Sequence, residues 1–114
     1  MRFALLVLDG PLVGPACRSA LAFAHALRSD GHVLEIAFFH GEGARAALAP
    51  ADAAERLTES EWMALAGAGV PLLACATALE RRGLRAGSRA VVPGSLGQLM
   101  AALDRVDRVV TFAN

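Results

Sequence analysis

The chain has 114 residues, of which 55% are hydrophobic and 19% are charged, and its eleven arginines balance eleven acidic residues. This length predicts a single domain over residues 1–114, and the neutral balance gives no electrostatic reason for an obligatory nucleic-acid or anionic-membrane partner. The chain contains no lysine, which excludes a Walker A phosphate loop and Schiff-base catalysis. No apolar stretch is long enough to span a bilayer and no signal peptide is recognisable, so we expect a cytoplasmic protein.

The N-terminal half alternates between strand and helix patterns. Apolar runs at residues 3–8 and 32–39 predict two strands, and an apolar stripe predicts a helix over residues 19–30 between them. The glycine-rich loop 9–15 lacks the G-x-G-x-x-G spacing of dinucleotide-binding turns. Residues 44–48 predict a helical turn or two, and residues 51–57 predict a loop or broken helix. A capping-box pattern then predicts that a helix begins at Thr58 and ends in the glycines at 67–69.

The C-terminal half continues the alternation. Residues 70–74 predict a third strand, and residues 76–82 predict a short helix that Gly83 ends. Residues 90–92 predict a fourth strand, followed by a turn at 93–95, and Ser95 is the expected N-cap of a helix with an apolar stripe. A fifth strand is expected over residues 108–112. This alternation predicts a three-layer α/β/α fold with a mostly parallel five-stranded sheet.

Cys75 falls at the junction between the third strand and the helix that follows it. The carboxyl edge of a parallel sheet is where ligands and chemistry gather. Backbone N–H groups of a first helical turn favour a thiolate, which is the reactive form of cysteine. Free cysteine is also one of the most buried residue types and often acts as a small hydrophobe. The position alone therefore leaves a reactive and a structural cysteine equally open.

The other candidate groups give weaker signals. His25, His32 and His40 have no paired metal spacing, so we expect no metal site. His40 ends a strand at the sheet edge that also carries Cys75. Two interpretations stay open: His40 acts on a thiol or on a leaving group, or it is a solvated loop residue. Cys17 either approaches Cys75, if their strands are neighbours, or is a small residue entering a helix. The two cysteines form no C-x-x-C motif, so neither a disulfide framework nor a zinc site is expected.

A basic cluster follows the Cys75 helix. It consists of Arg81, Arg82, Arg85 and Arg89. Two interpretations stay open, a solvated face or a docking surface for an acidic partner or an RNA backbone.

Short segments spread over most of the chain carry a family resemblance. They are residues 1–4, 20–27 with 30–32, Phe38 and Phe39 with Glu42 and Gly43, Trp62, Cys75 with 78–83, Leu96 with Gly97 and Leu99, and 107–110. These segments resemble the DsrE/TusD family of small sulfur-transfer proteins. The segment between Gly83 and Leu96 is shorter than in the members that act in tRNA thiolation.

The resemblance implies that Cys75 accepts sulfane sulfur as a persulfide and passes it along a protein relay, as a carrier-type sulfurtransferase. The relay would serve tRNA 2-thiouridine synthesis or sulfur oxidation. It implies donor and acceptor protein partners, a homo-oligomer or a hetero-hexamer with paralogous subunits, no cofactor and no direct nucleic-acid contact. The residues expected to line the site are His40, Gly41, Glu42, Gly43, Ala76, Thr77, Ser95, Leu96 and Gly97.

Two alternatives remain. The protein could be a non-catalytic subunit of a DsrE-like oligomer, in which Cys75 is only structural. It could also be a nucleotide-binding α/β module that uses the loop at residues 10–15, although the missing glycine spacing and the missing lysine weigh against this function.

Overall fold

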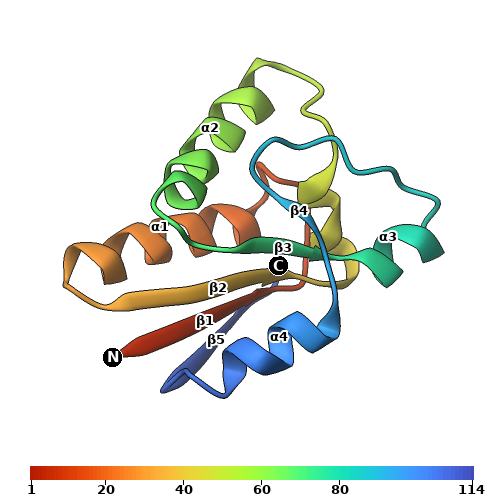
Figure 1. Ribbon diagram of the computed structural model, residues 1–114. Coiled ribbons are helices and arrows are strands. Elements are labelled where there is room, and N and C mark those ends of the chain that lie inside the picture. Colours follow the sequence, from red (N-terminus) through yellow and green to blue (C-terminus); the bar gives the residue numbers. More distant parts are fainter.

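The computed structural model describes residues 1–114 and contains one parallel sheet flanked by helices (Figure 1). The elements are β1 (Arg2–Val7), α1 (Pro15–Ser29), β2 (Val33–Phe39), the 3-10 helix η1 (Gly41–Ala47), α2 (Ala53–Gly67), β3 (Leu72–Cys75), α3 (Ala76–Arg81), β4 (Val92–Gly94), α4 (Leu96–Leu103) and β5 (Arg108–Phe112). The strand order is β4-β3-β2-β1-β5 and every pairing is parallel. The predicted α/β fold with a five-stranded parallel sheet is confirmed.

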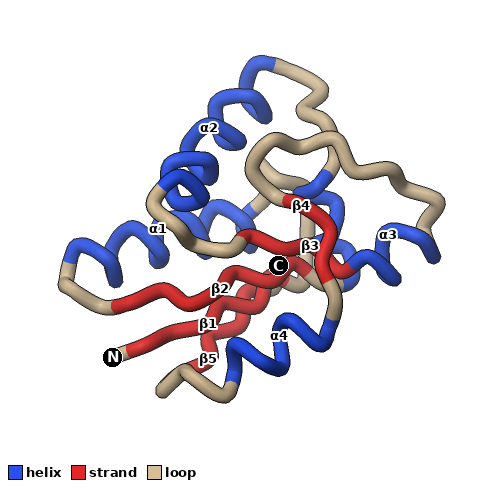
Figure 2. Tube along the Cα trace, in the orientation of Figure 1, coloured by secondary structure: helices blue, strands red, loops and turns tan.

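The helices form a layer on each face of the sheet (Figure 2). Helices α1 and α2 cover one face, where Phe23 of α1 packs edge-on against Phe3 of β1 and Trp62 of α2 packs against Phe39 of β2. Helix α4 covers the other face, because the chain returns from β4 at one edge of the sheet to β5 at the other. Helix α3 and η1 lie beyond the carboxyl ends of the strands, where they frame the candidate site.

The central strands are covered on both faces. All four residues of β3 and the last four of β2 are buried, as expected of interior strands in a parallel sheet. Trp62, Phe38 and Phe39 are the largest fully buried side chains. The strand ends at the carboxyl edge are therefore fixed by a packed core.

Helix α2 begins earlier than the sequence pattern predicts. Its N-cap is Asp52, whose carboxylate accepts a hydrogen bond from Glu55 N–H at 2.9 Å. The Thr58 hydroxyl instead donates to the Ala54 carbonyl inside the helix. The predicted start at Thr58 and the predicted loop or broken helix at 51–57 are wrong, because an N-cap carboxylate six residues upstream of Thr58 satisfies the first turn of one continuous helix.

Two further boundaries differ from the expectation. Helix α1 begins at Pro15, four residues before the predicted start, with proline in the first turn, where its missing N–H costs no hydrogen bond. Strand β4 covers Val92–Gly94 and not residues 90–92. The Ser88 hydroxyl accepts the N–H groups of Ala90 and Val91, which removes them from the ladder. Pro93 fits within β4 because this is an edge strand.

Candidate functional site

The carboxyl ends of β2, β3 and β4 meet at one edge of the sheet. Phe39 pairs with Ala74, so His40 follows β2 beside the position at which Cys75 ends β3. Cys75 in turn pairs with Gly94 of β4. The expectation that His40 and Cys75 share one edge of the sheet is confirmed.

Cys75 is the last residue of β3 and the residue immediately before α3. Only 2% of its surface is exposed, and its thiol makes no hydrogen bond within the chain. Helix α3 has six residues and ends where Gly83 adopts φ +63°, a left-handed conformation that suits glycine. Cys75 is one of the residues that line a cavity at this strand end.

This cavity, here called the Cys75 cavity, has a volume of about 370 Å³. It is lined by His40, Gly41, Cys75, Thr77, Ala78, Arg81, Arg82 and Leu96. Five of these are among the residues that the sequence predicts for the site. The sequence does not predict Ala78, Arg81 and Arg82 as lining residues, although it shows the two arginines as part of a basic cluster.

The remaining predicted residues surround the cavity without lining it. Gly43 lies within η1, where an added Cβ would lie 2.1 Å from the Val7 carbonyl oxygen, so its role here is a close backbone approach. Ser95 forms a capping box with Gln98, which confirms it as the N-cap of α4. Gly97 lies in the first turn of α4 and Ala76 is the first residue of α3.

Glu42 joins η1 to α3 at the rim of the Cys75 cavity. One carboxylate oxygen accepts Nε–H of Arg82 and the other accepts Nε–H of Arg45 at 2.8 Å. The hydrogen bond from Arg82, followed by that from Arg45, lowers the pKa of Glu42 from its usual 4.5. Arg82 also donates to the Ala78 carbonyl, so it is held on both sides.

The basic cluster is divided between different surroundings. Arg81 and Arg82 line the Cys75 cavity. Arg89 lies against the buried Glu59 of α2, which accepts its backbone N–H at 3.0 Å and lies 3.5 Å from its Nε. Arg85 is exposed and pairs with no carboxylate. All four arginines are exposed, but only Arg81 and Arg82 belong to the cavity.

Cys17 lies in α1 and belongs to the core. It has no exposed surface, and its thiol donates to the Asp9 carbonyl at 3.4 Å. Burial, with a smaller contribution from the Asp9 carboxylate, raises the pKa of Cys17 to about 12. Because β2 separates β1 from β3, the strands that precede the two cysteines are not neighbours. This geometry favours the interpretation of Cys17 as a small residue entering a helix.

No three residues of His, Cys, Asp or Glu gather in a group that could hold a metal ion. His32 Nδ1 lies 3.0 Å from the N-terminal amine and its ring packs edge-on against Phe3. His25 lies on α1 in a separate cavity. The structure thus offers no metal-ligand set to consider beside Cys75.

The crevice between β1 and β5 is the point at which the strand order reverses, and such points bind nucleotides in many α/β folds. Here the crevice holds Asn114. Its side-chain oxygen accepts Ala16 N–H at 3.0 Å and its amide donates to Gly10 carbonyl oxygen. Asp9 accepts the backbone N–H of Asn114. These bonds use polar groups that a phosphate would need, which weighs against the nucleotide-binding alternative.

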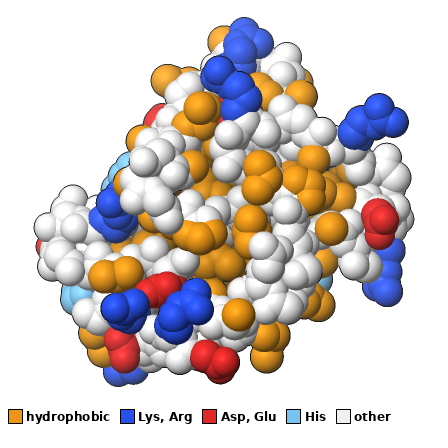
Figure 3. All heavy atoms as spheres, viewed as in Figure 1, with side chains coloured by type: hydrophobic (Ala, Val, Ile, Leu, Met, Phe, Trp, Pro, Cys, Tyr) orange, Lys and Arg blue, Asp and Glu red, His pale blue; other side chains and the backbone are white.

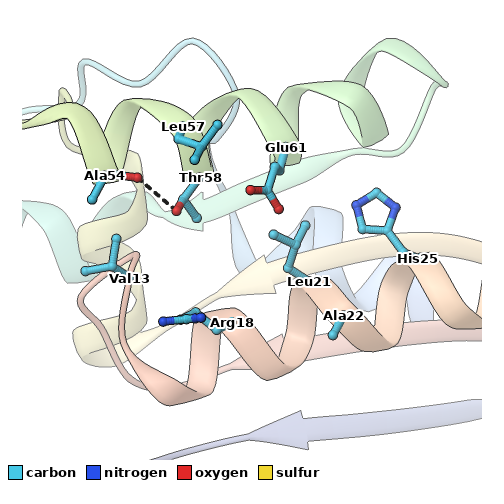
Figure 4. A pocket seen from close by; sticks show the side chains of 9 residues that line it. All are labelled: Val13, Arg18, Leu21, Ala22, His25, Ala54, Leu57, Thr58 and Glu61. Carbon is cyan, nitrogen blue, oxygen red and sulfur yellow. Dashed lines mark hydrogen bonds between the residues drawn. The ribbon is translucent and has the colours of Figure 1, made fainter.

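The largest cavity, of about 420 Å³, lies between α1 and α2 (Figure 4). Arg18 and His25 approach it from α1, and Thr58 and Glu61 approach it from α2. It contains no cysteine and shares no residue with the Cys75 cavity. Of the four cavities, only the Cys75 cavity combines a thiol with cationic side chains.

The comparison with known families agrees with this geometry. The sequence model of the DsrE/DsrF-like family matches residues 1–112. The chain belongs to this family. The resemblance inferred from the sequence is confirmed, and the match covers every element described above.

Family relatives align over nearly the whole chain. Sulfurtransferase TusD from Salmonella paratyphi B (strain ATCC BAA-1250 / SPB7) is 38% identical over 130 aligned positions, which cover 98% of this chain and 100% of the relative. Sulfurtransferase TusD from Salmonella heidelberg (strain SL476) gives the same values. The crystal structure of the ychN protein from E. coli has a TM-score of 0.75 at 25% identity and covers 98% of this chain and 100% of that one.

None of the helices of this chain has the length and apolar character needed to cross a membrane.

Proposed function

We propose that this protein is a sulfur carrier of the sulfurtransferase type, and that Cys75 carries the sulfur as a persulfide. The family match and the TusD relatives support a role in sulfur transfer. The proposed relay leads to tRNA 2-thiouridine synthesis or to sulfur oxidation. It runs in the cytoplasm, where reducing conditions keep both thiols free.

The contrast between the two cysteines carries the proposal. Cys17 is buried, hydrogen-bonded and has a pKa raised to about 12, so its thiolate is scarce at neutral pH. Cys75 has no hydrogen-bond partner and faces a cavity lined by cationic side chains. Of the two cysteines, only Cys75 lines a cavity.

The transfer step is an exchange between sulfur atoms. The Cys75 thiolate attacks the outer sulfur of a donor persulfide, and the new S–S bond forms as the donor's S–S bond breaks. The electron pair of the broken bond leaves with the donor sulfur as a thiolate, so no oxidant or reductant is consumed. An acceptor cysteine then removes the outer sulfur from Cys75 by the same step.

The proposed partners include further subunits, either copies of this chain or paralogues that complete a hexamer. Strand β4 is an edge strand, and α4 follows it directly. Val92, Leu96 and Met100 on these elements are 46%, 51% and 61% exposed. Figure 3 shows hydrophobic side chains near the middle of the face on which β4 and α4 lie. Apolar groups that gather in this way favour burial against another subunit.

Intact-mass spectrometry tests the carrier function. After incubation with a protein persulfide donor, the wild type should gain the mass of one sulfur, about 32 Da, and a reducing agent should remove it. Cys75→Ser should gain nothing, whereas Cys17→Ser should load normally. If Cys75→Ser still loads, or if the wild type never loads, the cysteine is structural and the non-catalytic subunit becomes the better interpretation.

Light scattering tests the assembly separately. The wild type should have a mass well above that of the 11.8 kDa chain. Met100→Glu should reduce this mass because it places a charge in the β4–α4 surface. Leu57→Glu is the matched control, since Leu57 is similarly exposed, at 65%, but lies on α2. A monomeric wild type at micromolar concentration would refute the assembly.

A further inference from the structure

The Cys75 cavity carries an excess of positive charge. Two arginines and one histidine line it, and no carboxylate does. Glu42 at its rim is already shared between Arg82 and Arg45. Arg81 has no acidic partner anywhere in the chain.

The elements around the cavity leave the Arg81 charge uncompensated. On η1, the single carboxylate is Glu42, which is bound by its two arginines. On α3, Glu80 is exposed and does not line the cavity. Helix α4 contains no charged residue between Leu96 and Leu103. The imidazole of His40 makes no hydrogen bond, and its ring centroid lies 6.3 Å from that of Phe38.

We propose that Arg81 forms an anion-binding position beside Cys75, and that this position holds the negatively charged outer sulfur of a persulfide. The proposal rests on the carrier function given above and names the charge state of its cargo. A persulfide is a stronger acid than a thiol, so its outer sulfur is anionic near neutral pH. Guanidinium stays protonated under the same conditions and is less strongly hydrated than an ammonium, which suits a large, soft anion.

This position answers a difficulty in the transfer step. An anionic donor persulfide and the Cys75 thiolate repel each other. The exchange also yields two anions, the Cys75 persulfide and the donor thiolate. A fixed positive charge at the same cavity lowers the energy of that encounter. Arg82 serves this purpose less well, because Glu42 offsets its charge. The two adjacent arginines therefore have different roles, with Arg82 holding the rim and Arg81 binding the anion.

A pair of alkylating reagents isolates the charge effect. Iodoacetate and iodoacetamide react with the same thiolate and expel the same iodide, but only iodoacetate is anionic. The ratio of their rate constants at Cys75 cancels the thiolate fraction and most of the effect of access. Peptide mapping separates Cys75 from Cys17, and 2-mercaptoethanol, which carries no charge besides its thiolate, gives the ratio for a thiol in free solution.

We expect the wild-type iodoacetate-to-iodoacetamide ratio to exceed that of 2-mercaptoethanol and to fall about two- to fivefold in Arg81→Gln, as for the loss of one unit charge that lines the same cavity, in a water-like medium. Arg81→Lys should keep most of the ratio because it keeps the charge. Arg85→Gln is the matched control, an exposed arginine outside the cavity, and should match the wild type. Added salt should lower the wild-type ratio toward that of Arg81→Gln.

A second measurement connects the charge to the cargo. Loading of Cys75 from inorganic polysulfide, which is anionic, should be slower in Arg81→Gln, while the final mass gain should equal that of the wild type. Arg81→Gln with an unchanged alkylation ratio and unchanged loading rate would overturn the anion-binding position while leaving the carrier function intact. A changed ratio in a protein that never loads would instead reject the persulfide as the cargo, together with the carrier function.

Discussion

Arg82, the C-cap residue of α3, and Glu42 of η1 are 40 positions apart in the sequence, yet they form a hydrogen-bonded ion pair across the rim of the Cys75 cavity. Arg45 completes the arrangement by donating to the second oxygen of the same carboxylate. The pair connects the segment that follows β2 to the helix that follows β3. It therefore bridges the two sides of the cavity.

The first prediction concerns the titration of Glu42. Its pKa lies below 4.5 because Arg82, and then Arg45, stabilise the carboxylate. A lowered native pKa means that the stabilisation is present above the unfolded value and is lost as the pH falls through the native pKa. Arg82→Gln removes the hydrogen bond that lowers the pKa of Glu42 most, so it should raise this pKa toward 4.5. Carbon NMR of the carboxyl group across an acid titration measures this change.

The adjacent arginine provides the control for that experiment. Arg81→Gln removes the same charge from the same helix without touching Glu42. Its Glu42 titration should remain close to that of the wild type. Equal shifts in the two variants would show that the summed charge of the nearby arginines, rather than the direct hydrogen bond from Arg82, lowers the pKa of Glu42.

The second prediction concerns stability at high pH. The chain has neither lysine nor tyrosine, so in a Cys75→Ser background Cys17 is the one side chain that titrates between about pH 9 and 12. Its raised native pKa keeps Cys17 protonated in the fold while the unfolded thiol ionises above its ordinary value of 9.0. The free energy of unfolding should therefore fall by about 1.4 kcal/mol per pH unit through this range, to a total of about 4 kcal/mol.

Urea denaturation of Cys75→Ser at several pH values measures this slope. The Cys17→Ala, Cys75→Ser double variant removes the titrating thiol and should show a nearly flat profile over the same range. A slope that persists in the double variant would mean that the loss of stability at high pH does not come from Cys17.

The buried strands and the shared sheet edge could be predicted from sequence because their causes are local. Interior parallel strands are continuous apolar runs, and the β2 and β3 runs place His40 and Cys75 at strand ends. The partners of the site arginines could not be predicted, since a basic run shows no carboxylate 40 positions away. The start of α1 was missed for the same reason, because its Ala16 N–H bonds to Asn114.

The third prediction concerns a helix boundary at which two local signals compete. Both Asp52 and Thr58 are acceptable N-cap residues, and the structure selects Asp52. Asp52→Ala should lower the free energy of unfolding by about 1 kcal/mol because Glu55 N–H loses its acceptor. Thr58→Ala should be close to neutral, since the Thr58 hydroxyl bonds only to the carbonyl four residues back. Thermal denaturation of both variants measures the difference, and a larger loss in Thr58→Ala would place the helix start at Thr58 after all.

The last prediction concerns two glycines that the sequence placed together in the site. An added Cβ at Gly43 would lie 2.1 Å from the Val7 carbonyl oxygen, whereas at Gly97 the nearest atom is Ser95 Oγ at 3.6 Å. Gly43→Ala should therefore force η1 away from β1 and lower the free energy of unfolding by about 2 kcal/mol or more. Gly97→Ala should raise it by about 0.5–1 kcal/mol because alanine favours a helix.

The same pair of variants separates the position of η1 from the chemistry of Cys75. His40 and Gly41 line the cavity where the chain enters η1, and η1 packs closely on the end of β1 at Gly43. Folded Gly43→Ala should therefore load sulfur on Cys75 more slowly than the wild type, while Gly97→Ala should load at the wild-type rate. Urea denaturation gives the stabilities and intact-mass time courses give the loading rates. Wild-type loading in a clearly destabilised Gly43→Ala would show that the η1 side of the cavity takes no part in sulfur transfer.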